Sequence, residues 1–523
     1  MKTIFQYIIG AMAVCSLTTS CNDYLDIYPE NSLPADKYWA NKEDVEAELM
    51  NGYNVLRNSV VSNIIPWGEF RSGCLTSTPG TGSNMLQKLE IKSSNTSYCS
   101  WSNMYQIVNT ANLVLKNAAS AQSNDATYNA GELNSHYCEA YFLRALAYFY
   151  IVRNWRDAPL SLEAYDDDKT ERNLPKSTDK QILAQIKSDL HTADSLNAAK
   201  EEFETTWETK GRATKWAIYA LMSDVCLWDG DFDNAITYAD KILNATSNKA
   251  PRFLSTATRS SWFSMFNPGN SNESIFELQW SHEKYSNGIA QTNTLPYIFS
   301  DVQNSSYSQY KMCQPLLDEF ESDYDEIITN SHGTDPEATG RTLYGTYSTG
   351  GYIWKYIGGT SRTDKRTTTY YDPNFIIYRV ADVMLIKAEA LVMRSLDGNV
   401  ADYQAALDLV NKIRQRSNLP ASLTITANSD AASVLELILS EQLKEFAGEG
   451  KSWYHMLCLG HFPTSHGIDF KTTFLINNVI KYNTTASDSW IRSVLNNDNA
   501  WYLPITDNEI KVNGNLIQNP YYN

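Results

Sequence analysis

The sequence predicts a mainly α-helical protein, in which a scaffold of tetratricopeptide-like helical pairs carries a large, irregular and partly β insertion region. Apolar residues recur at 3.6-residue spacing over much of the chain, and two stretches have a helix-turn-helix form. Two long segments lose this periodicity and are rich in Ser, Thr, Asn and Gly. The 523 residues are 43% hydrophobic and 20% charged, which indicates a folded protein rather than a disordered or fibrous one.

The N-terminus, residues 1–20, has the form of a secretory signal. Lys2 precedes the apolar stretch Ile4–Val14, and a short polar run leads to Cys21. This resembles a bacterial lipoprotein signal, in which Cys21 becomes the lipidated first residue of the mature chain. Thr18 stands where such signals usually have a large aliphatic residue, so an ordinary cleaved signal and a soluble periplasmic product remain the alternative.

The rest of the chain, residues 21–523, is expected to form one domain anchored by lipid. No later segment approaches eighteen consecutive apolar residues, the length that a membrane-spanning helix requires. Lys and Arg number 43 against 60 Asp and Glu, a net charge of −17, and no basic run is present. Nucleic acid is therefore not an expected partner.

The clearest predicted helix runs from Ser135 to Trp155 and is followed by the helix-stopping Pro159. Its apolar stripe consists of Tyr137, Tyr141, Ala145, Tyr148, Val152 and Trp155. Trp101, Trp155, Trp216 and Trp228 are assigned to packing in the same helical core. Further helices are expected near residues 43–57, 101–119, 179–196, 213–228, 232–244, 375–394, 401–416 and 431–447. The scaffold therefore comprises about 43–57, 101–244 and 375–447.

Two stretches, Trp216–Leu243 and Val380–Ile413, look like helix-turn-helix repeat units. In the first, Gly230 permits a tight turn and Ala235 permits a close approach of the two helices. The pattern resembles a tetratricopeptide repeat, and a generic helical hairpin is the alternative.

The regions 59–100 and 246–374 are predicted to be ligand-binding insertions. Ser274–Trp280 and Tyr352–Ile357 alternate like short strands, and glycine-containing turns separate such runs. Long irregular segments on a rigid scaffold are where binding residues usually lie.

No sequence motif of covalent catalysis or cofactor binding is present. The chain has no phosphate-binding P-loop, zinc-protease, nucleophile-elbow or dinucleotide-binding motif. Asp229, Asp231 and Asp233 are spaced as in a calcium loop, but Asn234 replaces the required glycine, so we interpret them as an acidic turn and helix cap. We expect no cofactor and no catalytic residue.

The cysteines and histidines do not suggest a metal site. Six cysteines follow Cys21 without a CxxC pair, and we expect most of them to be buried thiols, with a Cys74–Cys99 bridge left open. The histidines near 455–466 lack the spacing of a ligand pair. Glutamates at 441, 445 and 449 fall on one helix face, for which we expect a solvated or salt-bridged surface.

Several blocks together resemble the SusD/RagB family of outer-membrane nutrient-binding lipoproteins. They are Cys21–Pro29, Glu139–Tyr150, Tyr378–Ala390, Tyr502–Ile510 and Gln518–Tyr521. The chain departs from the family where members often show Arg and Asp near the end of the last long helix, because Lys451 and the pair Tyr454-His455 stand there instead.

The resemblance implies a fold with four tetratricopeptide-like helical pairs and a less regular ligand-binding half. It also implies a lipid anchor in the outer membrane, exposure at the cell surface, and pairing with a SusC-like TonB-dependent transporter. Such members bind oligosaccharide, or in some cases peptide, and carry out no covalent chemistry. Their binding residues vary with the ligand, so the resemblance transfers none of them.

A neutral sugar offers hydroxyl groups and apolar C–H faces, so its receptor needs exposed rings together with Arg, Asn, Asp or Gln. We chose candidates from the irregular regions rather than from helical stripes. The candidate ligand-binding residues are Trp67, Arg71, Tyr98, Trp280, Tyr285, Asn287, Tyr297, Tyr352 and Trp354.

Three hypotheses follow. The favoured one is a non-enzymatic glycan-binding protein of the cell surface that delivers its ligand to an outer-membrane transporter. The second is a peptide-binding member of the same family. The third is a surface glycoside hydrolase or lyase, which would need a carboxylate pair that sequence alone does not identify.

Overall fold

The computed structural model describes residues 38–77, 84–166, 171–255, 258–282, 293–301, 308–330, 341–359, 364–367, 370–420 and 430–523. The predicted signal, Cys21, Tyr285 and Asn287 lie outside these ranges. Within them the chain is mainly helical, as expected from the sequence. Among the described residues, no helix combines the length and the apolar character needed to cross a bilayer.

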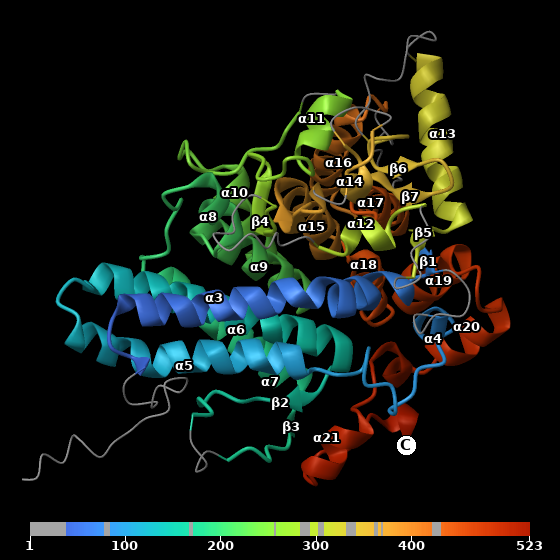
Figure 1. Ribbon diagram of the computed structural model, residues 1–523. Helices are drawn as coiled ribbons and strands as arrows, with labels where there is room; N and C mark the ends of the chain where they lie inside the picture. Colours follow the sequence, from blue (N-terminus) through green and yellow to red (C-terminus); the bar gives the residue numbers. More distant parts are fainter. Residues whose placement is uncertain are drawn as a thin grey trace, which may run out of the picture.

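Long helices build the lower half of the molecule in Figure 1, where α3 (Lys42–Ser59), α5 (Ser102–Asn124) and α6 (Ala130–Trp155) lie side by side. The predicted helix 135–155 is confirmed as α6, which starts earlier because Asn129 and Glu132 form a capping box. Its side chains are buried almost all round from Leu133 onward. Such a helix must be packed on several sides.

The two predicted helix-turn-helix units are confirmed as packed helical pairs. The first is α9 (Lys215–Trp228) with α10 (Phe232–Leu243), and the second is α15 (Val380–Arg394) with α16 (Val400–Arg416). Gly230 adopts a φ of 79° between α9 and α10, which a residue with a side chain rarely adopts. The pairs contact one another through α10 and α15.

The other helices belong to the scaffold, to the insertion region and to the C-terminal part, which lies at the bottom and right of Figure 1. They are α4 (Asn84–Gln87), α7 (Asp179–Ser195), α8 (Thr206–Gly211), α11 (Arg259–Ser264), α12 (Leu295–Ile298), α13 (Gln314–Asn330), α14 (Trp354–Ile357), α17 (Ala431–Glu445), α18 (Ser452–Gly460), α19 (Asn477–Tyr482), α20 (Asp488–Leu495) and α21 (Asp507–Val512).

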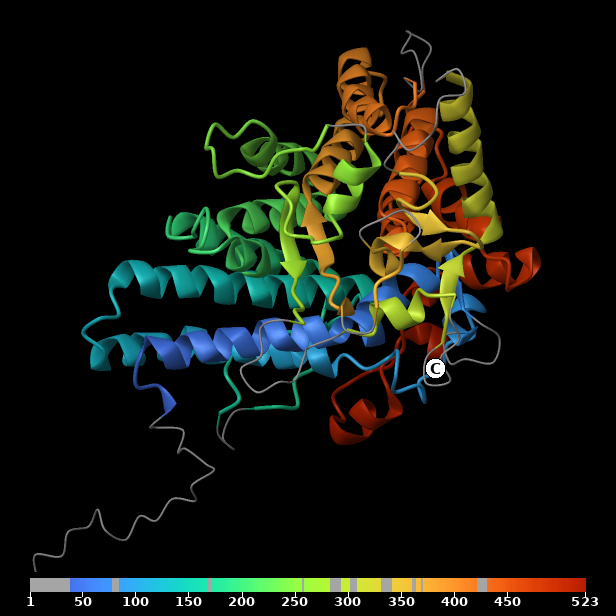
Figure 2. The same cartoon turned by 45° about the horizontal axis from the view of Figure 1, so that its top comes forward.

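The strands form four two-stranded antiparallel sheets in the described part of the chain. The pairs are β1 (Leu75–Ser77) with β5 (Tyr310–Met312), β2 (Ala158–Pro159) with β3 (Lys176–Ser177), β4 (Ser274–Leu278) with β8 (Phe375–Arg379), and β6 (Tyr347–Ser348) with β7 (Tyr352–Ile353). The β4–β8 ribbon lies between the lower helices and α15 in Figure 2.

Two predicted elements need correction. The helix expected from residue 375 begins at Val380, because residues 375–379 form β8, and all five of them are buried. A strand buried on both faces lacks alternation and reads like a helical segment. The strand expected at 352–357 ends at Ile353 and continues as α14, while the strand expected at 274–280 is confirmed as β4.

The glutamate face of α17 is salt-bridged but not solvated. Glu441, Glu445 and the following Glu449 have no exposed side-chain surface and pair with cations from four other segments. We call this set the buried ion cluster; its members are Glu273, Arg341, Lys355, Arg379, Arg414, Arg416, Glu441, Glu445 and Glu449. It joins α14 and Glu273, the residue before β4, in the insertion region to the last residue of β8, to α16 and to the end of α17.

The six cysteines of the described residues are buried and free, as expected for most of them, and no Cys74–Cys99 bridge forms. In the acidic turn, Asp231 occupies the N-cap position of α10 but accepts from the Asn234 side chain rather than from the helix backbone. Across the ranges that the structure describes, no cluster of three His, Cys, Asp or Glu is placed to hold a metal ion.

Candidate ligand-binding cleft

A cleft of about 930 Å³ opens where α8 meets the segments that follow β4 and precede β8. We call it the main cleft. Figure 1 shows α8 and β4 next to each other above α3. A capping box between Thr205 and Glu208 holds the first turn of α8, and the β4–β8 pairing brings residues 280–282 and 370–374 together. The volume is in the range of clefts that bind small ligands.

Three aromatic rings line the main cleft. Trp207 on α8 is 37% exposed and Tyr370 is 51% exposed, both high for large rings. Trp280 is half-buried, with the Arg57 guanidinium 5.9 Å from its ring centroid. A ring that keeps one face in solvent can cover the C–H face of a sugar or another flat apolar surface.

A hydrogen-bonded triad forms the polar side of the main cleft. His282 donates through Nδ1 to Asp372, and Asp372 also accepts from Arg366 Nη1 at 3.1 Å. Arg366 Nη2 donates to the Phe266 carbonyl at 2.9 Å, so the guanidinium is fixed from two sides. Burial lowers the pKa of Arg366 to about 10, which leaves it charged at neutral pH. The triad therefore fixes the orientation of the His282 ring at the cleft wall.

Asn374 supports the base of the cleft. Its Nδ2 donates to Glu277 at 2.7 Å and to Gln279 at 3.0 Å, and its Oδ1 accepts from the Trp280 backbone at 3.3 Å. Burial raises the pKa of Glu277, which also accepts from the Asn270 backbone. These bonds hold the Trp280 backbone in place.

Of the residues that the sequence predicted, Trp280 lines the main cleft. Trp67, Arg71 and Trp354 are 0%, 1% and 1% exposed, so their burial places them in packing rather than in the cleft. Trp67 Nε1 donates to the Tyr98 carbonyl at 2.7 Å, and Arg71 donates to the Trp501 carbonyl at 2.8 Å.

The remaining predicted residues are spread over the insertion region. Tyr98, Tyr297 and Tyr352 are half-buried and do not line the main cleft. Tyr297 packs edge-on against Tyr371, with ring centroids 4.6 Å apart. Tyr285 and Asn287 lie outside the described residues.

The sequence did not single out Trp207, Tyr370, His282 or Asp372. Trp207 lies in a short helix, α8, inside the part of the chain that was assigned to the scaffold. The sequence feature that could have identified Trp207 is a large aromatic residue in a segment, Thr205–Gly211, that has no apolar stripe. His282 and Asp372 are 90 residues apart, and no spacing rule connects them.

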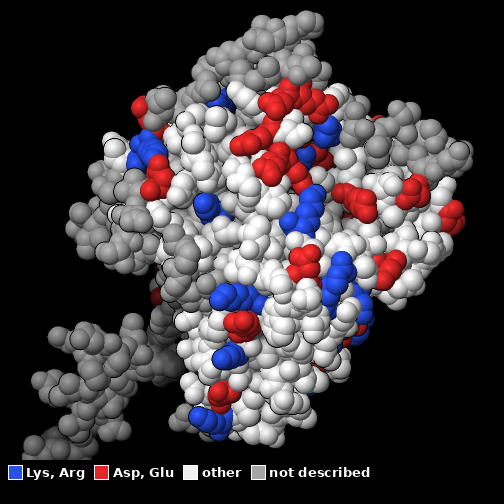
Figure 3. Space-filling model, turned by 90° about the vertical axis from the view of Figure 1, so that its right-hand side faces the viewer, with Lys and Arg blue, Asp and Glu red and all other residues white. Residues whose placement is uncertain are grey.

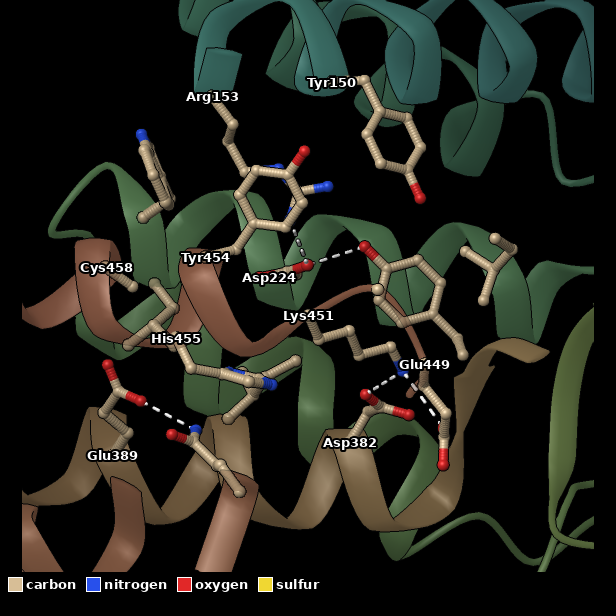
Figure 4. Close-up of a pocket in the computed structure, with 17 residues that line it drawn as sticks. Tyr150, Arg153, Asp224, Asp382, Glu389, Glu449, Lys451, Tyr454, His455 and Cys458 are labelled. Atoms are coloured by element: carbon tan, nitrogen blue, oxygen red, sulfur yellow. Dashed lines mark hydrogen bonds and ion pairs between the residues drawn. The ribbon is translucent and has the colours of Figure 1, made fainter. Parts of the chain in front are cut away.

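A second, enclosed cavity of about 40 Å³ lies between α6, α9, α15 and α18 (Figure 4). Figure 4 shows Arg153 directed at Asp224. The Tyr378 hydroxyl donates to Asp224 at 2.7 Å, and Gln442 Nε2 donates to Glu389 at 2.9 Å. Burial raises the pKa of Glu389 to about 7 and lowers that of His455 to about 3. The volume is far too small for a sugar ring, so the cavity is part of the core.

The face shown in Figure 3 carries acidic side chains over its upper part. The helix α13, at the right of Figure 1, contributes the exposed acids Asp318, Glu321, Asp325 and Glu326 and has no Lys or Arg. A surface of this charge repels phosphate backbones and gives no support for nucleic-acid binding here.

Two models of known protein families match this chain. A model described as "SusD family" matches residues 323–522, and one described as "Starch-binding associating with outer membrane" matches residues 23–227. The chain belongs to the SusD family. The recognition made from sequence blocks at both ends and in the middle of the chain is thereby confirmed.

Curated relatives and solved structures agree with this family. The chain is 25% identical over 479 residues to SusD-like protein P38 of Formosa agariphila, covering 84% of this chain and 88% of the relative. It is 26% identical over 483 residues to a SusD-like protein of Bacteroides ovatus, covering 84% and 80%.

The solved structures show that the fold is that of the SusD superfamily. A SusD superfamily protein of Bacteroides fragilis has a TM-score of 0.70 at 20% identity and covers 93% of this chain and 100% of its own. A structure described as a laminarin-binding SusD-like protein has a TM-score of 0.64 at 20% identity and covers 92% and 100%.

Proposed function

We propose that this SusD-family chain captures a glycan at the cell surface and delivers it to a SusC-like TonB-dependent transporter of the outer membrane, without changing it chemically. The observation that carries the proposal is the main cleft, in which Trp207, Trp280 and Tyr370 flank the His282–Asp372–Arg366 triad. Rings beside fixed polar groups match the two kinds of surface that a sugar presents.

The similar proteins also support a glycan as the ligand. One matching family model is described as starch-binding and as associating with the outer membrane, and one structural neighbour is described as laminarin-binding. In this account Cys21 carries the lipid anchor, residues 21–523 act as one domain, and the glycan itself is the ligand to be identified.

The test measures binding and turnover on the same samples. Wild type, Trp280→Ala and Tyr370→Ala are run through gels that contain single polysaccharides, and retardation reports binding. Trp490→Ala is the matched control, because Trp490 is 41% exposed but lies on α20, outside the cleft. We expect one polysaccharide to retard wild type and the control but not the two cleft variants.

Release of reducing sugar is followed in parallel. Reducing ends formed by wild type would overturn the proposal in favour of a glycoside hydrolase. Binding to a mixed peptide digest but to no polysaccharide would instead favour the peptide-binding alternative.

A further inference from the structure

A smaller hollow of about 250 Å³ adjoins the main cleft, between α3, α8 and the end of β4. We call it the side hollow. Trp207 lines both spaces, so its indole forms a wall that they share. Arg57 lines the side hollow and at the same time lies 5.9 Å from the Trp280 ring centroid of the main cleft.

Hydrogen bonds of Gln279 link the linings of the two spaces. It lines the side hollow, its Nε2 donates to Asn270 Oδ1 at 2.5 Å, and its Oε1 accepts from Asn374 Nδ2 at 3.0 Å. Asn270 and Asn374 both line the main cleft. Hydrogen bonds therefore join the linings of the two spaces, in addition to the wall of Trp207 that they share.

The polar groups of the side hollow are built into the fold. Arg212, with 8% of its side chain exposed, pairs with Glu46 and donates to Glu139 at 2.8 and 3.0 Å. Glu46 keeps 43% of its side chain exposed. Arg57 Nη2 donates to Oδ1 of the exposed Asn54 at 2.6 Å, which fixes the orientation of the Asn54 side-chain amide. A fixed carboxylate and a fixed amide are the groups that bond to sugar hydroxyls.

We propose that one ligand chain runs from the main cleft over Trp207 into the side hollow, so that the protein selects oligosaccharides long enough to occupy both. Glu46 and Asn54 bond the hydroxyl groups of the distal sugar units, and Trp207 covers a unit between the two spaces. This inference rests on the proposed function of the main cleft and adds the selection by chain length.

The test is calorimetric titration with a size series of oligosaccharides, prepared by partial hydrolysis of the polysaccharide that wild type binds. Wild type is compared with the double variant Glu46→Ala/Asn54→Ala and with Glu48→Ala, a control on the same helix whose residue does not line either space. Melting temperatures confirm that all three proteins are folded.

For wild type we expect affinity to rise with chain length and then level off. The double variant should bind the shortest ligands as wild type does and lose about tenfold on the longer ones, the effect of one or two hydrogen bonds. Equal loss at every length, or no loss at any length, would overturn the inference. If wild type binds no oligosaccharide or polysaccharide at all, the proposed function itself fails, a result distinct from both.

Discussion

Arg379 and Glu449 form a two-point ion pair in the interior of the protein, with Nε to Oε2 at 3.2 Å and Nη2 to Oε1 at 3.1 Å. Neither side chain has exposed surface. Arg379 ends β8, the strand that pairs with β4 of the insertion region, whereas Glu449 follows α17 of the scaffold. The pair therefore ties the part that carries the main cleft to the part that supports it.

Replacing Arg379 by Met should destabilise the fold strongly. The change removes a cation that Glu445 and Glu449 share, while Arg341, Arg416 and Lys355 remain as partners. Because it breaks a buried ion network, we expect a loss of about 3–5 kcal/mol in the free energy of unfolding. Urea unfolding followed by far-ultraviolet circular dichroism measures it. Lys116→Met is the control, because Lys116 pairs with Asp166 at the surface and should cost less than about 1 kcal/mol. Equal effects of the two changes would contradict this account of the buried ion cluster.

Acid should weaken the same cluster. Burial by itself would raise the pKa values of Glu441 and Glu449, but Arg341 and Arg379 with neighbouring lysines outweigh burial and hold both at about 2. Groups with a depressed pKa stabilise the fold above their unfolded pKa near 4.5. The stability that these two carboxylates contribute should therefore be constant above about pH 5 and fall steadily toward pH 2. A flat profile between pH 5 and 2 in urea titrations would count against the prediction.

The buried Glu389 should give stability the opposite pH dependence, so that its contribution falls as the pH rises. Because burial raises its pKa from 4.5 to about 7, its contribution is complete below pH 4.5 and is lost as the pH rises through 7. Glu389→Gln keeps the shape of the side chain and cannot ionise. Between pH 5 and 8, the free energy of unfolding of this variant should therefore fall less than that of wild type, by up to about 3 kcal/mol. The exposed Glu90→Gln serves as the control and should follow wild type.

The proposed lipid attachment at Cys21 predicts that loss of this residue releases the protein from the membrane. Cys21→Ala, expressed in a bacterium with lipoprotein processing, should leave the membrane fraction and the detergent phase of a phase-separation assay. Mass spectrometry of the wild-type N-terminus should show an acylated Cys21. A variant that stays with the membrane would point to another means of attachment.

Periodic helices could be predicted from the sequence because their apolar stripes are local. The stripe of α6 and the hairpins predicted at Trp216–Leu243 and Val380–Ile413 needed no information beyond about thirty neighbouring residues. Strand β8 could not be separated from α15, because a fully buried strand shows no alternation.

The candidate site could be predicted only in part, since it depends on contacts between distant segments. Trp280 was found because it follows an alternating strand in an irregular region. Trp207 was missed because it sits in a helical part of the chain, and Tyr370, which lines the same cleft, is 163 residues away from it in the sequence. Arg341, a partner of both Glu441 and Glu445, also lies about a hundred residues away from them.

The most direct test of the central claim is calorimetric titration of residues 22–523 with plant, host and microbial polysaccharides and with a mixed peptide digest. Wild type and Trp280→Ala are titrated side by side. We predict saturable heat from one glycan with wild type, a loss of at least about tenfold in affinity with the variant, and no heat from peptides. Heat from peptides alone, or glycan binding that Trp280→Ala leaves unchanged, would contradict the assignment of the main cleft as the glycan site.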